Sequence, residues 1–294
     1  MTDIFAAAMR ANRRPTDLMM LPVDWNPAAI PARAVVEMKY DGIHLGYSRR
    51  LEVGGYSREG TPFRAVSHLR GALDAVEGEL QRMTGRLHRL FGEYVHMDGF
   101  DAAVSDFQRG KGTGVVMLFD GVDEDAYRGQ RHSLPLLERK AMLIAAAAAA
   151  GVSLSDGGVM VAPHDLFTSD DARDRIEVAA GEQWALGLEG LVTKDADSPY
   201  VRGPSPYWMR LKRTETADLP IRDVEVIDGR VKAALVDVKP GVVARIGRGI
   251  SDALRAVPAA FRRGRIMEVK HLGHTKSGNL RSASFLRFRD DKES

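Results

Sequence analysis

Helical and strand-like patterns alternate over most of this chain, and the alternation stops near residues 214–220. The remainder of the chain contains one helical stretch interrupted by Pro258 and three short β-type runs, at 223–227, 231–238 and 265–273. Several short strands within about 75 residues are typical of a small β-barrel. The pattern therefore predicts two domains, residues 1–216 and 217–294, with a hinge at 214–220.

The first part of the chain is expected to be a mixed α+β domain. Strand-like runs are expected at 34–38, 43–48, 53–59 and 115–122, and the second and third of these flank a turn as a hairpin would. Helical spacing of apolar residues predicts three helices: 69–83 with Ser67 as its N-cap, 133–151 with Ser133 as its N-cap, and 169–187.

The chain of 294 residues contains no cysteine. Disulfides and thiolate zinc sites are therefore excluded, a reducing cytosol is expected, and any metal must be held by oxygen or imidazole. The eight histidines suggest no pairing at metal-ligand spacing, so no metal is assigned to them. No apolar run is long enough for a membrane span, and residues 1–17 do not resemble a secretory signal.

The net charge of +2 is unevenly distributed along the chain. Residues 220–294 carry 16 lysines and arginines against 9 acidic residues, which leaves an excess of +7 there and −5 in the preceding part. A basic C-terminal domain on a mildly acidic body fits a clamp for a polyanion, and it fits a solvated basic face equally well.

A lone lysine, Lys39, ends the strand-like run in "VEMKYDGIHL" and is followed by Asp41 and Gly42. Burying an unpaired ammonium costs several kcal/mol, so either the chain reaches the surface here or the lysine has a chemical task. A lysine attacks as a nucleophile only when it is deprotonated. With a reference pKa of about 10.4, this costs about 4 kcal/mol near neutral pH unless cations or desolvation lower the pKa.

Six further motifs come after Lys39 in order: "SREG" (57–60), "FGEYV" (91–95), "VMLFDG" (116–121), "EGLVTK" (189–194), "YWMRLK" (207–212) and "SFLRFRDDK" (284–292). With this ordered set the chain resembles the covalent nucleotidyltransferase superfamily, most closely the short, phage-type ATP-dependent DNA ligases. The resemblance implies an α+β fold: an adenylation domain of antiparallel sheets and helices, followed by a C-terminal OB-fold β-barrel.

The resemblance also implies roles for individual residues. Lys39 would attack the α-phosphate of ATP and carry AMP, with Asp41 and Gly42 beside it. The remaining nucleotide contacts would be Glu37 on the adenine side, Arg58 on the nucleotide and the nick phosphate, Glu93 on the ribose, Phe119 stacked on adenine, Lys194 nearby, and Arg210 with Lys212 on the α-phosphate.

The same resemblance implies two further roles. Glu93 and Glu189 would provide oxygen ligands for Mg²⁺, with Mn²⁺ as an alternative. Arg289, Asp291 and Lys292 match an R-x-D-K element that orients the leaving pyrophosphate. Each assignment has a simpler interpretation: Phe119 and Trp208 as core, the glutamates as exposed turn residues, and the C-terminal cations as a charged tail.

The sequence departs from the ligase pattern at two positions. His44 stands where these enzymes have arginine, and because histidine titrates near neutral pH, the contact at this position is expected to be pH-sensitive between pH 6 and 8.5. Arg210 stands where lysine is usual, which keeps the charge but presents a bidentate fork.

The expected activity is sealing of nicks in duplex DNA by a monomeric enzyme that uses ATP. The expected setting is DNA replication or repair in the cytosol of a bacterium or a phage-infected cell. Three alternatives stay open: an mRNA-capping guanylyltransferase, an RNA ligase, and a nucleic-acid-binding module without catalysis. Label transferred from GTP instead of ATP would favour the first, and absence of any adduct would favour the last.

Overall fold

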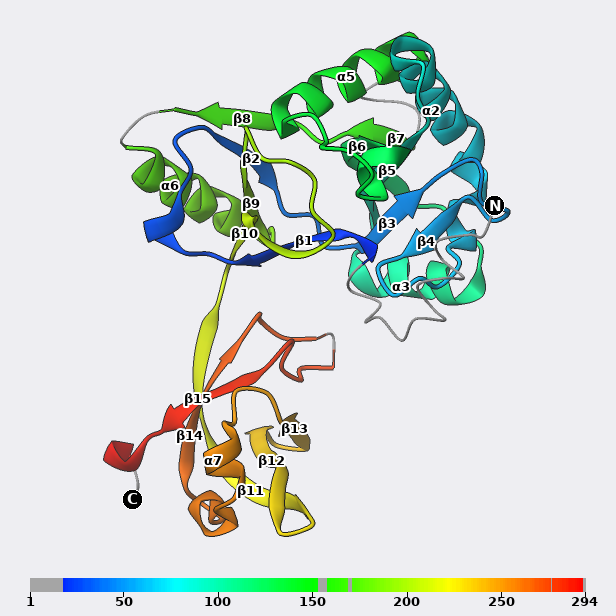
Figure 1. The fold of residues 1–294 in the computed structure, drawn as a ribbon. Helices are drawn as coiled ribbons and strands as arrows, with labels where there is room; N and C mark the ends of the chain where they lie inside the picture. Colours follow the sequence, from blue (N-terminus) through cyan, green and yellow to red (C-terminus); the bar gives the residue numbers. More distant parts are fainter. Residues whose placement is uncertain (1–17, 153–157, 169–170, 276, 293–294) are drawn as a thin grey trace. The chain divides into compact units, whose positions relative to one another are not determined.

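A computed structural model describes residues 18–152, 158–168, 171–275 and 277–292 of the protein (Figure 1). The chain divides into two compact units, Met1–Leu211 and Lys212–Ser294. The first unit contains two mixed sheets with helices, and the second is built mainly from strands.

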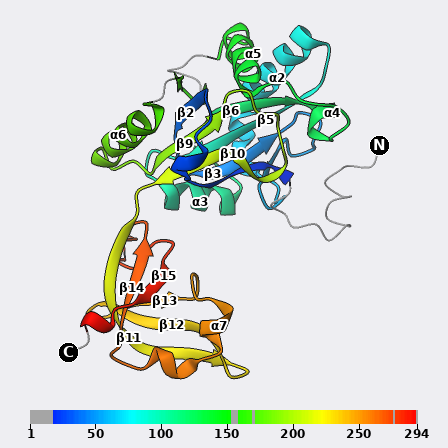
Figure 2. The same ribbon diagram turned by 60° about the vertical axis from the view of Figure 1, so that its left-hand side comes forward.

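The first unit contains two five-stranded sheets (Figures 1 and 2). One has the order β1-β10-β9-β2-β8: β1 Met20–Asp24, β10 Gly203–Lys212, β9 Gly190–Asp195, β2 Ala34–Met38 and β8 His164–Phe167. The other has the order β4-β3-β5-β6-β7: β4 Gly55–Ser57, β3 Ile43–Tyr47, β5 His88–Val95, β6 Val115–Asp123 and β7 Val159–Val161. The β1–β10 and β6–β7 pairs are parallel, and the β2–β8, β2–β9, β3–β4, β3–β5 and β5–β6 pairs are antiparallel.

Helices cover the outer faces of these sheets. The helices of the first unit are α2 Arg70–Thr84, α3 Phe100–Arg109, α4 Glu124–Tyr127, α5 Leu136–Ala149 and α6 Ala172–Ala185, with 3₁₀ turns at Pro27–Ala29 and Arg64–Leu69. Helices α2 and α5 lie side by side against β5 and β6, whereas α6 packs on β2 and β9 (Figure 1).

The two faces of strand β2 pack against different neighbours. Ala34 and Val36 pack toward α6, whereas Val35 belongs to a cluster with residues of both sheets, such as Phe91 and Trp208. Because successive side chains of a strand point to opposite faces, Glu37 lies on the same face as Val35. A carboxylate is therefore directed into an otherwise apolar layer.

The strand and hairpin predictions are confirmed by β2, β3, β4 and β6, but both predicted helix caps are wrong. Ser67 lies inside the 3₁₀ turn that precedes α2, so no side chain caps that helix. The N-cap of α5 is Pro135, and the Ser133 hydroxyl instead accepts a hydrogen bond of 2.6 Å from the Tyr200 amide. The predicted start of the third helix, 169–170, lies outside the described residues.

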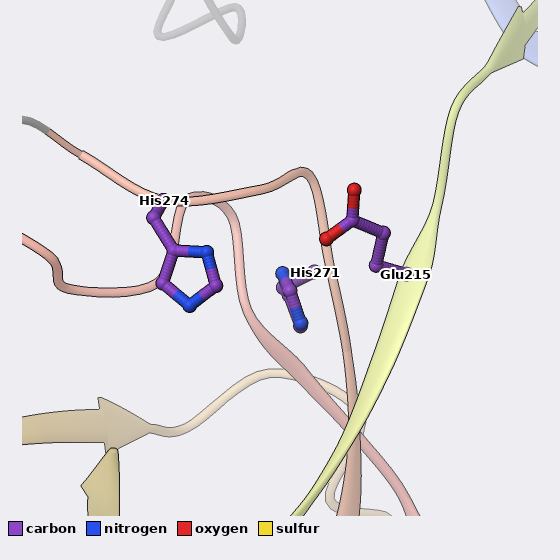
Figure 3. Close-up of side chains that lie close together, drawn as sticks. All are labelled: Glu215, His271 and His274. Atoms are coloured by element: carbon purple, nitrogen blue, oxygen red, sulfur yellow. The ribbon is translucent and has the colours of Figure 1, made fainter. Parts of the chain in front are cut away.

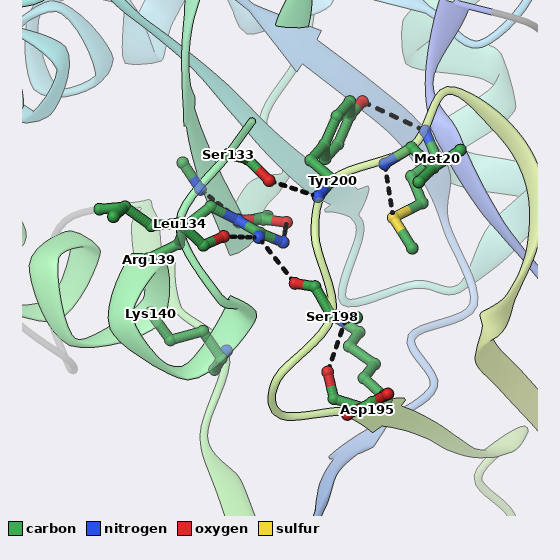
Figure 4. A network of polar contacts seen from close by, with 12 residues as sticks. Met20, Ser133, Leu134, Arg139, Lys140, Asp195, Ser198 and Tyr200 are labelled. Atoms are coloured by element: carbon green, nitrogen blue, oxygen red, sulfur yellow. Dashed lines mark hydrogen bonds and ion pairs between the residues drawn. The ribbon is translucent and has the colours of Figure 1, made fainter. Parts of the chain in front are cut away.

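A buried arginine joins α5 to the loop between β9 and β10 (Figure 4). Arg139 donates to both carboxylate oxygens of Asp120 at 2.8 Å, and to the carbonyls of Leu134 and Ser198. Arg139 and Asp120 are almost completely buried, at 3% and 0% exposure. Five N–H donors in a planar fork allow one side chain to satisfy all of these acceptors.

Glu77 on α2 gives the first unit a pH-dependent stability. It is fully buried, accepts a hydrogen bond of 2.7 Å from the Arg49 amide, and has a pKa that burial raises to about 7. Between its ordinary pKa of 4.5 and this value, the folded state holds a proton that the unfolded chain has released. The stabilisation by neutral Glu77 is therefore present below pH 4.5 and is lost as the pH rises to about 7.

We expect Glu77→Gln to stabilise the first unit by about 1–3 kcal/mol at pH 8 and to leave it unchanged near pH 4.5, because the amide stays neutral throughout. Urea unfolding followed by tryptophan fluorescence measures this unit selectively, since Trp25, Trp184 and Trp208 all lie within it. An equal effect of the substitution at both pH values would contradict the titration.

The second unit is one five-stranded sheet of order β13-β12-β11-β14-β15. Its elements are β11 Glu215–Ile227, β12 Arg230–Lys239, β13 Val242–Ile246, α7 Asp252–Arg255, a 3₁₀ turn at Pro258–Phe261, β14 Ile266–His271, β15 Ser284–Phe288 and a 3₁₀ turn at Asp290–Lys292. Residues 215–220 pair with β14, so the segment expected to be a hinge is part of the sheet. In the described part of the chain the barrel is not closed, and only an isolated bridge, Arg248 to Ser284, links its two edges.

Candidate active site

Lys39 and Glu189 lie side by side at the paired ends of two strands. Lys39 follows β2 and Glu189 precedes β9, and the Lys39 amide donates to the Gly190 carbonyl at 2.8 Å. This pairing brings the Lys39 Nζ to 2.6 Å from the Glu189 carboxylate, with the two side chains 18% and 13% exposed. The amine is therefore largely sheltered and stays accessible to a small molecule.

A second carboxylate approaches from the other sheet. After Lys39 the chain passes into β3, where His44 lies opposite Glu93 of β5. The pKa of Glu93 is raised to about 7, chiefly by burial; the charges of Glu189 and Asp41 add to the rise, whereas those of Lys39 and Arg58 oppose it. Of the predicted residues, Lys39, Asp41, Arg58 and Glu189 are thus close enough to act on the Glu93 carboxylate.

The expectation for His44 is wrong. Burial lowers the pKa of its imidazole to about 3, and the nearby charges of Lys194, Arg58 and Lys39 act in the same direction. The ring is therefore neutral at any pH between 6 and 8.5, and its edge packs against Phe119 with a centroid distance of 5.2 Å. The expected titration of His44 near neutral pH is absent because the ring is buried and surrounded by cations, and neither condition is visible in the sequence.

Glu37 lies between two lysines: Lys194, which was predicted as a site residue without this partner, and Lys140, which was not predicted. Its carboxylate accepts from Lys194 at 2.6 Å and from Lys140 of α5, and all three groups are buried. Burial would raise the pKa of Glu37, but the charges of Lys194 and Lys140 outweigh it and hold this pKa below 4.5. Burial lowers the pKa of Lys194 despite the attraction of Glu37. Lys140 was missed, although a lone lysine in an apolar helix is an available signal.

The Lys194 ammonium also faces two aromatic rings. Its Nζ lies 4.5 Å from the centroid of Phe119 and 4.2 Å from that of Trp208. Cations are attracted to the faces of such rings, so these contacts help to hold the buried charge. Trp208 is a packing residue at 2% exposure, yet in the described structure its Nε1 and the His44 Nε2 are buried without a hydrogen-bond partner.

Gly42 is explained by the backbone of the neighbouring strand. A Cβ at this position would lie 2.2 Å from the Tyr94 carbonyl oxygen, which is a severe clash with backbone. Glycine is therefore required for β3 to approach β5, and this approach positions the segment that carries Lys39 and Asp41.

The other predicted cations are carried by separate segments of the chain. Arg58 is exposed and pairs with Glu59. Arg210, on β10, donates to Asp24 and to the Pro22 carbonyl, both at 2.9 Å. Lys212 begins the second unit.

The R-x-D-K residues form a network within the second unit. Arg289 donates to both oxygens of Asp291, at 2.8 and 2.7 Å, and to Asp218 of β11 at 3.1 Å. Lys292 donates to the same Asp218 at 2.5 Å. The hydrogen bonds from Arg289 lower the pKa of Asp291 to about 2. Asp218 was not singled out in the sequence.

The expectation that no histidines pair at metal-ligand spacing is wrong. His271 and His274, spaced H-x-x-H, lie close to Glu215 in the second unit. Among the described residues, Glu215, His271 and His274 are the one group of three or more potential metal ligands that lie close enough to hold a single ion. No described helix has the length and apolar character needed to cross a membrane.

Comparisons with known proteins bear on the fold of the chain. Residues 226–289 match the family described as DNA ligase OB-like domain. No curated protein matches the chain in sequence. The structure named Pmar-Lig_PreS3 superposes with a TM-score of 0.78 at 22% identity, covering 97% of this chain and 70% of the other.

Two further solved structures show the same architecture. A Lig E DNA ligase gives a TM-score of 0.71 at 21% identity, covering 92% of this chain and 98% of that ligase. The ATP-dependent DNA ligase of bacteriophage T7, in complex with ATP, gives 0.50 at 17% identity, covering 93% and 99%.

The chain has the fold of the ATP-dependent DNA ligases. The resemblance drawn from the ordered motifs is thereby confirmed at the level of the fold, as is the α+β class with an OB-like C-terminal unit. In this ligase fold the motifs around Lys39, Glu93 and Glu189 meet where the two sheets of the first unit adjoin.

Proposed function

We propose that the protein is an ATP-dependent DNA ligase that seals nicks between a 5′-phosphate and a 3′-hydroxyl through a lysyl-AMP intermediate. The observation that carries this proposal is the sheltered Lys39 amine, 2.6 Å from Glu189 and close to Glu93. An amine with adjacent acidic groups combines a nucleophile with sites for a cation, which is what nucleotidyl transfer from ATP requires.

In the proposed first step the Lys39 Nζ, after losing a proton, attacks the α-phosphorus of ATP. A P–N bond forms, the P–O bond to pyrophosphate breaks, and pyrophosphate leaves. Glu189, which accepts from the ammonium at 2.6 Å, is placed to orient Nζ and to receive its proton. The AMP then passes to the 5′-phosphate of the nick, and the 3′-hydroxyl displaces it.

The donor set fits the divalent cation that this chemistry uses. The charges of Glu189 and Asp41 both act to raise the pKa of Glu93. Mg²⁺ is typically held by one or two carboxylates together with substrate phosphates and water, and Mn²⁺ is the alternative. When bound, the cation would neutralise charge on the phosphates. Glu93 and Glu189 would hold it, and Glu93 would also face the ribose.

The other residues are proposed to act on the nucleotide and on DNA. Glu37 would select adenine, Phe119 would stack on it with Lys194 behind, and Arg58, Arg210 and Lys212 would contact phosphates. Arg289, Asp291 and Lys292 would orient the pyrophosphate. The domains 1–216 and 217–294 would act as the adenylation domain and the OB-fold domain of a cytosolic monomer. Duplex binding should then weaken steeply with salt.

Mass spectrometry of the purified protein after incubation with ATP and Mg²⁺ tests this proposal. A mass gain of one AMP, and joining of a nicked duplex by the same sample, are expected. A gain from GTP alone would point to a capping guanylyltransferase, joining of RNA but not DNA to an RNA ligase, and no adduct with normal duplex binding to a non-catalytic module.

The pH dependence of adenylylation should be independent of His44. Because the imidazole stays neutral from pH 6 to 8.5, we expect His44→Asn and the parent protein to give rate profiles of the same shape over that range. Single-turnover AMP transfer at several pH values measures this. An inflection near neutral pH that disappears in His44→Asn would show that the ring titrates there.

A further inference from the structure

Two histidines and a glutamate converge in the second unit, on residues that the proposed ligase chemistry does not use (Figure 3). Glu215 and His271 are directly opposite one another on the antiparallel strands β11 and β14, so their side chains share one face. His274 comes three residues later. One potential ligand atom from each of the three residues lies within 4.8 Å of the other two.

The local backbone accounts for the position of His274. Gly273 adopts a φ of +85°, which glycine accommodates most readily, and the chain turns back there. His274 then forms a β-bridge with Leu280. The turn brings the two imidazole rings to a centroid distance of 5.2 Å.

The buried His271 side chain already contacts the backbone through Nδ1. His271 is 3% exposed, and its Nδ1 lies 3.3 Å from the Gly273 carbonyl oxygen and 3.1 Å from the Gly273 amide. In one tautomer Nδ1 accepts from the Gly273 amide and Nε2 carries the proton; in the other, Nδ1–H donates to the Gly273 carbonyl and Nε2 carries a lone pair for a metal. A backbone carbonyl is a common partner for the second nitrogen of a metal-binding histidine.

We propose that Glu215, His271 and His274 bind a divalent transition-metal ion of the zinc class. Ligands of tetrahedral Zn²⁺, with bonds of about 2.0–2.2 Å, lie roughly 3.4 Å apart, so the three donors need to close by at most about 1.4 Å. The exposed side chain of His274 has the freedom to make this movement. Glu215 also pairs with Arg213 through Oε1 at 3.0 Å, and a carboxylate has two oxygens to share between an arginine and a metal.

The ligand types separate this site from the proposed catalytic one. Imidazole nitrogen favours Zn²⁺, Ni²⁺ and Cu²⁺, whereas Mg²⁺ prefers the all-oxygen group around Glu93 and Glu189. Three protein ligands leave a fourth position for water. The bound ion would join the loop after β14 to β11.

Zinc titration of the full-length, untagged protein in competition with a chromophoric chelator tests this site, in buffer with excess Mg²⁺. The parent protein should bind one Zn²⁺ per chain, and Co²⁺ in its place should give the visible absorption of a tetrahedral site. His274→Gln and Glu215→Gln should each weaken binding at least about tenfold. Both positions retain some exposure, so the variants should fold.

Two other histidines provide matched controls. His132 is exposed, and His96 lies near Asp98 and Asp106 in the first unit. His132→Gln and His96→Gln should bind Zn²⁺ as the parent does. The proposal is overturned if the parent does not compete with the chelator, if His274→Gln and Glu215→Gln bind normally, or if His96→Gln abolishes binding. None of these results depends on ligase activity.

Discussion

Lys39→Ala should form no AMP adduct and should seal nicks more than about 10³-fold more slowly than the parent protein, because the proposed covalent carrier is lost. Lys39→Arg should be equally inactive. A guanidinium can keep the ion pair with Glu189, but it does not deprotonate and therefore has no lone pair with which to attack phosphorus. Mass spectrometry and single-turnover joining measure both losses.

A nick that already carries AMP on its 5′-phosphate separates lost chemistry from lost structure. Its sealing needs only attack by the 3′-hydroxyl, so Lys39→Ala should join this substrate at close to the parent rate. If Lys39→Arg forms an adduct, the assignment of the nucleophile is wrong. If Lys39→Ala fails on the pre-adenylylated nick while its unfolding curve is unchanged, Lys39 has a further role in the last step.

Glu37→Gln should destabilise the first unit by about 3–5 kcal/mol, the largest stability effect expected. The substitution leaves the buried Lys140 and Lys194 ammonium groups beside one another without a carboxylate. The loss of stability should be smaller at high pH, because the buried lysines can then release a proton and become neutral. Urea unfolding monitored by tryptophan fluorescence, repeated at several pH values, measures it.

Lys140→Met is the matched control. It removes one of the two lysines and fills the same space with a flexible apolar side chain. Glu37 and Lys194 then remain as an ion pair with no net charge. We expect a change of no more than about 1 kcal/mol. If Lys140→Met proves as damaging as Glu37→Gln, the carboxylate is not what holds this cluster together.

The sequence predicted those parts of the site that depend on local order along the chain. Lys39 after an apolar strand, followed by carboxylates and cations in a fixed succession, was sufficient to indicate the ligase fold. Lys140, by contrast, is 103 residues from Glu37 and becomes its partner only when α5 packs over the sheet. The H-x-x-H pair was overlooked because its third ligand, Glu215, lies 56 residues before His271 and reaches it through strand pairing.

The sequence by itself determined where polar and apolar residues alternate, where apolar faces form, and in what order the charged motifs occur. Tertiary structure alone decided their protonation and their partners. His44 is neutral and Glu93 titrates near pH 7 because burial and the charges of distant segments act on them. Desolvation and Coulomb interactions depend on distances in space, and these distances are set by packing of the whole chain.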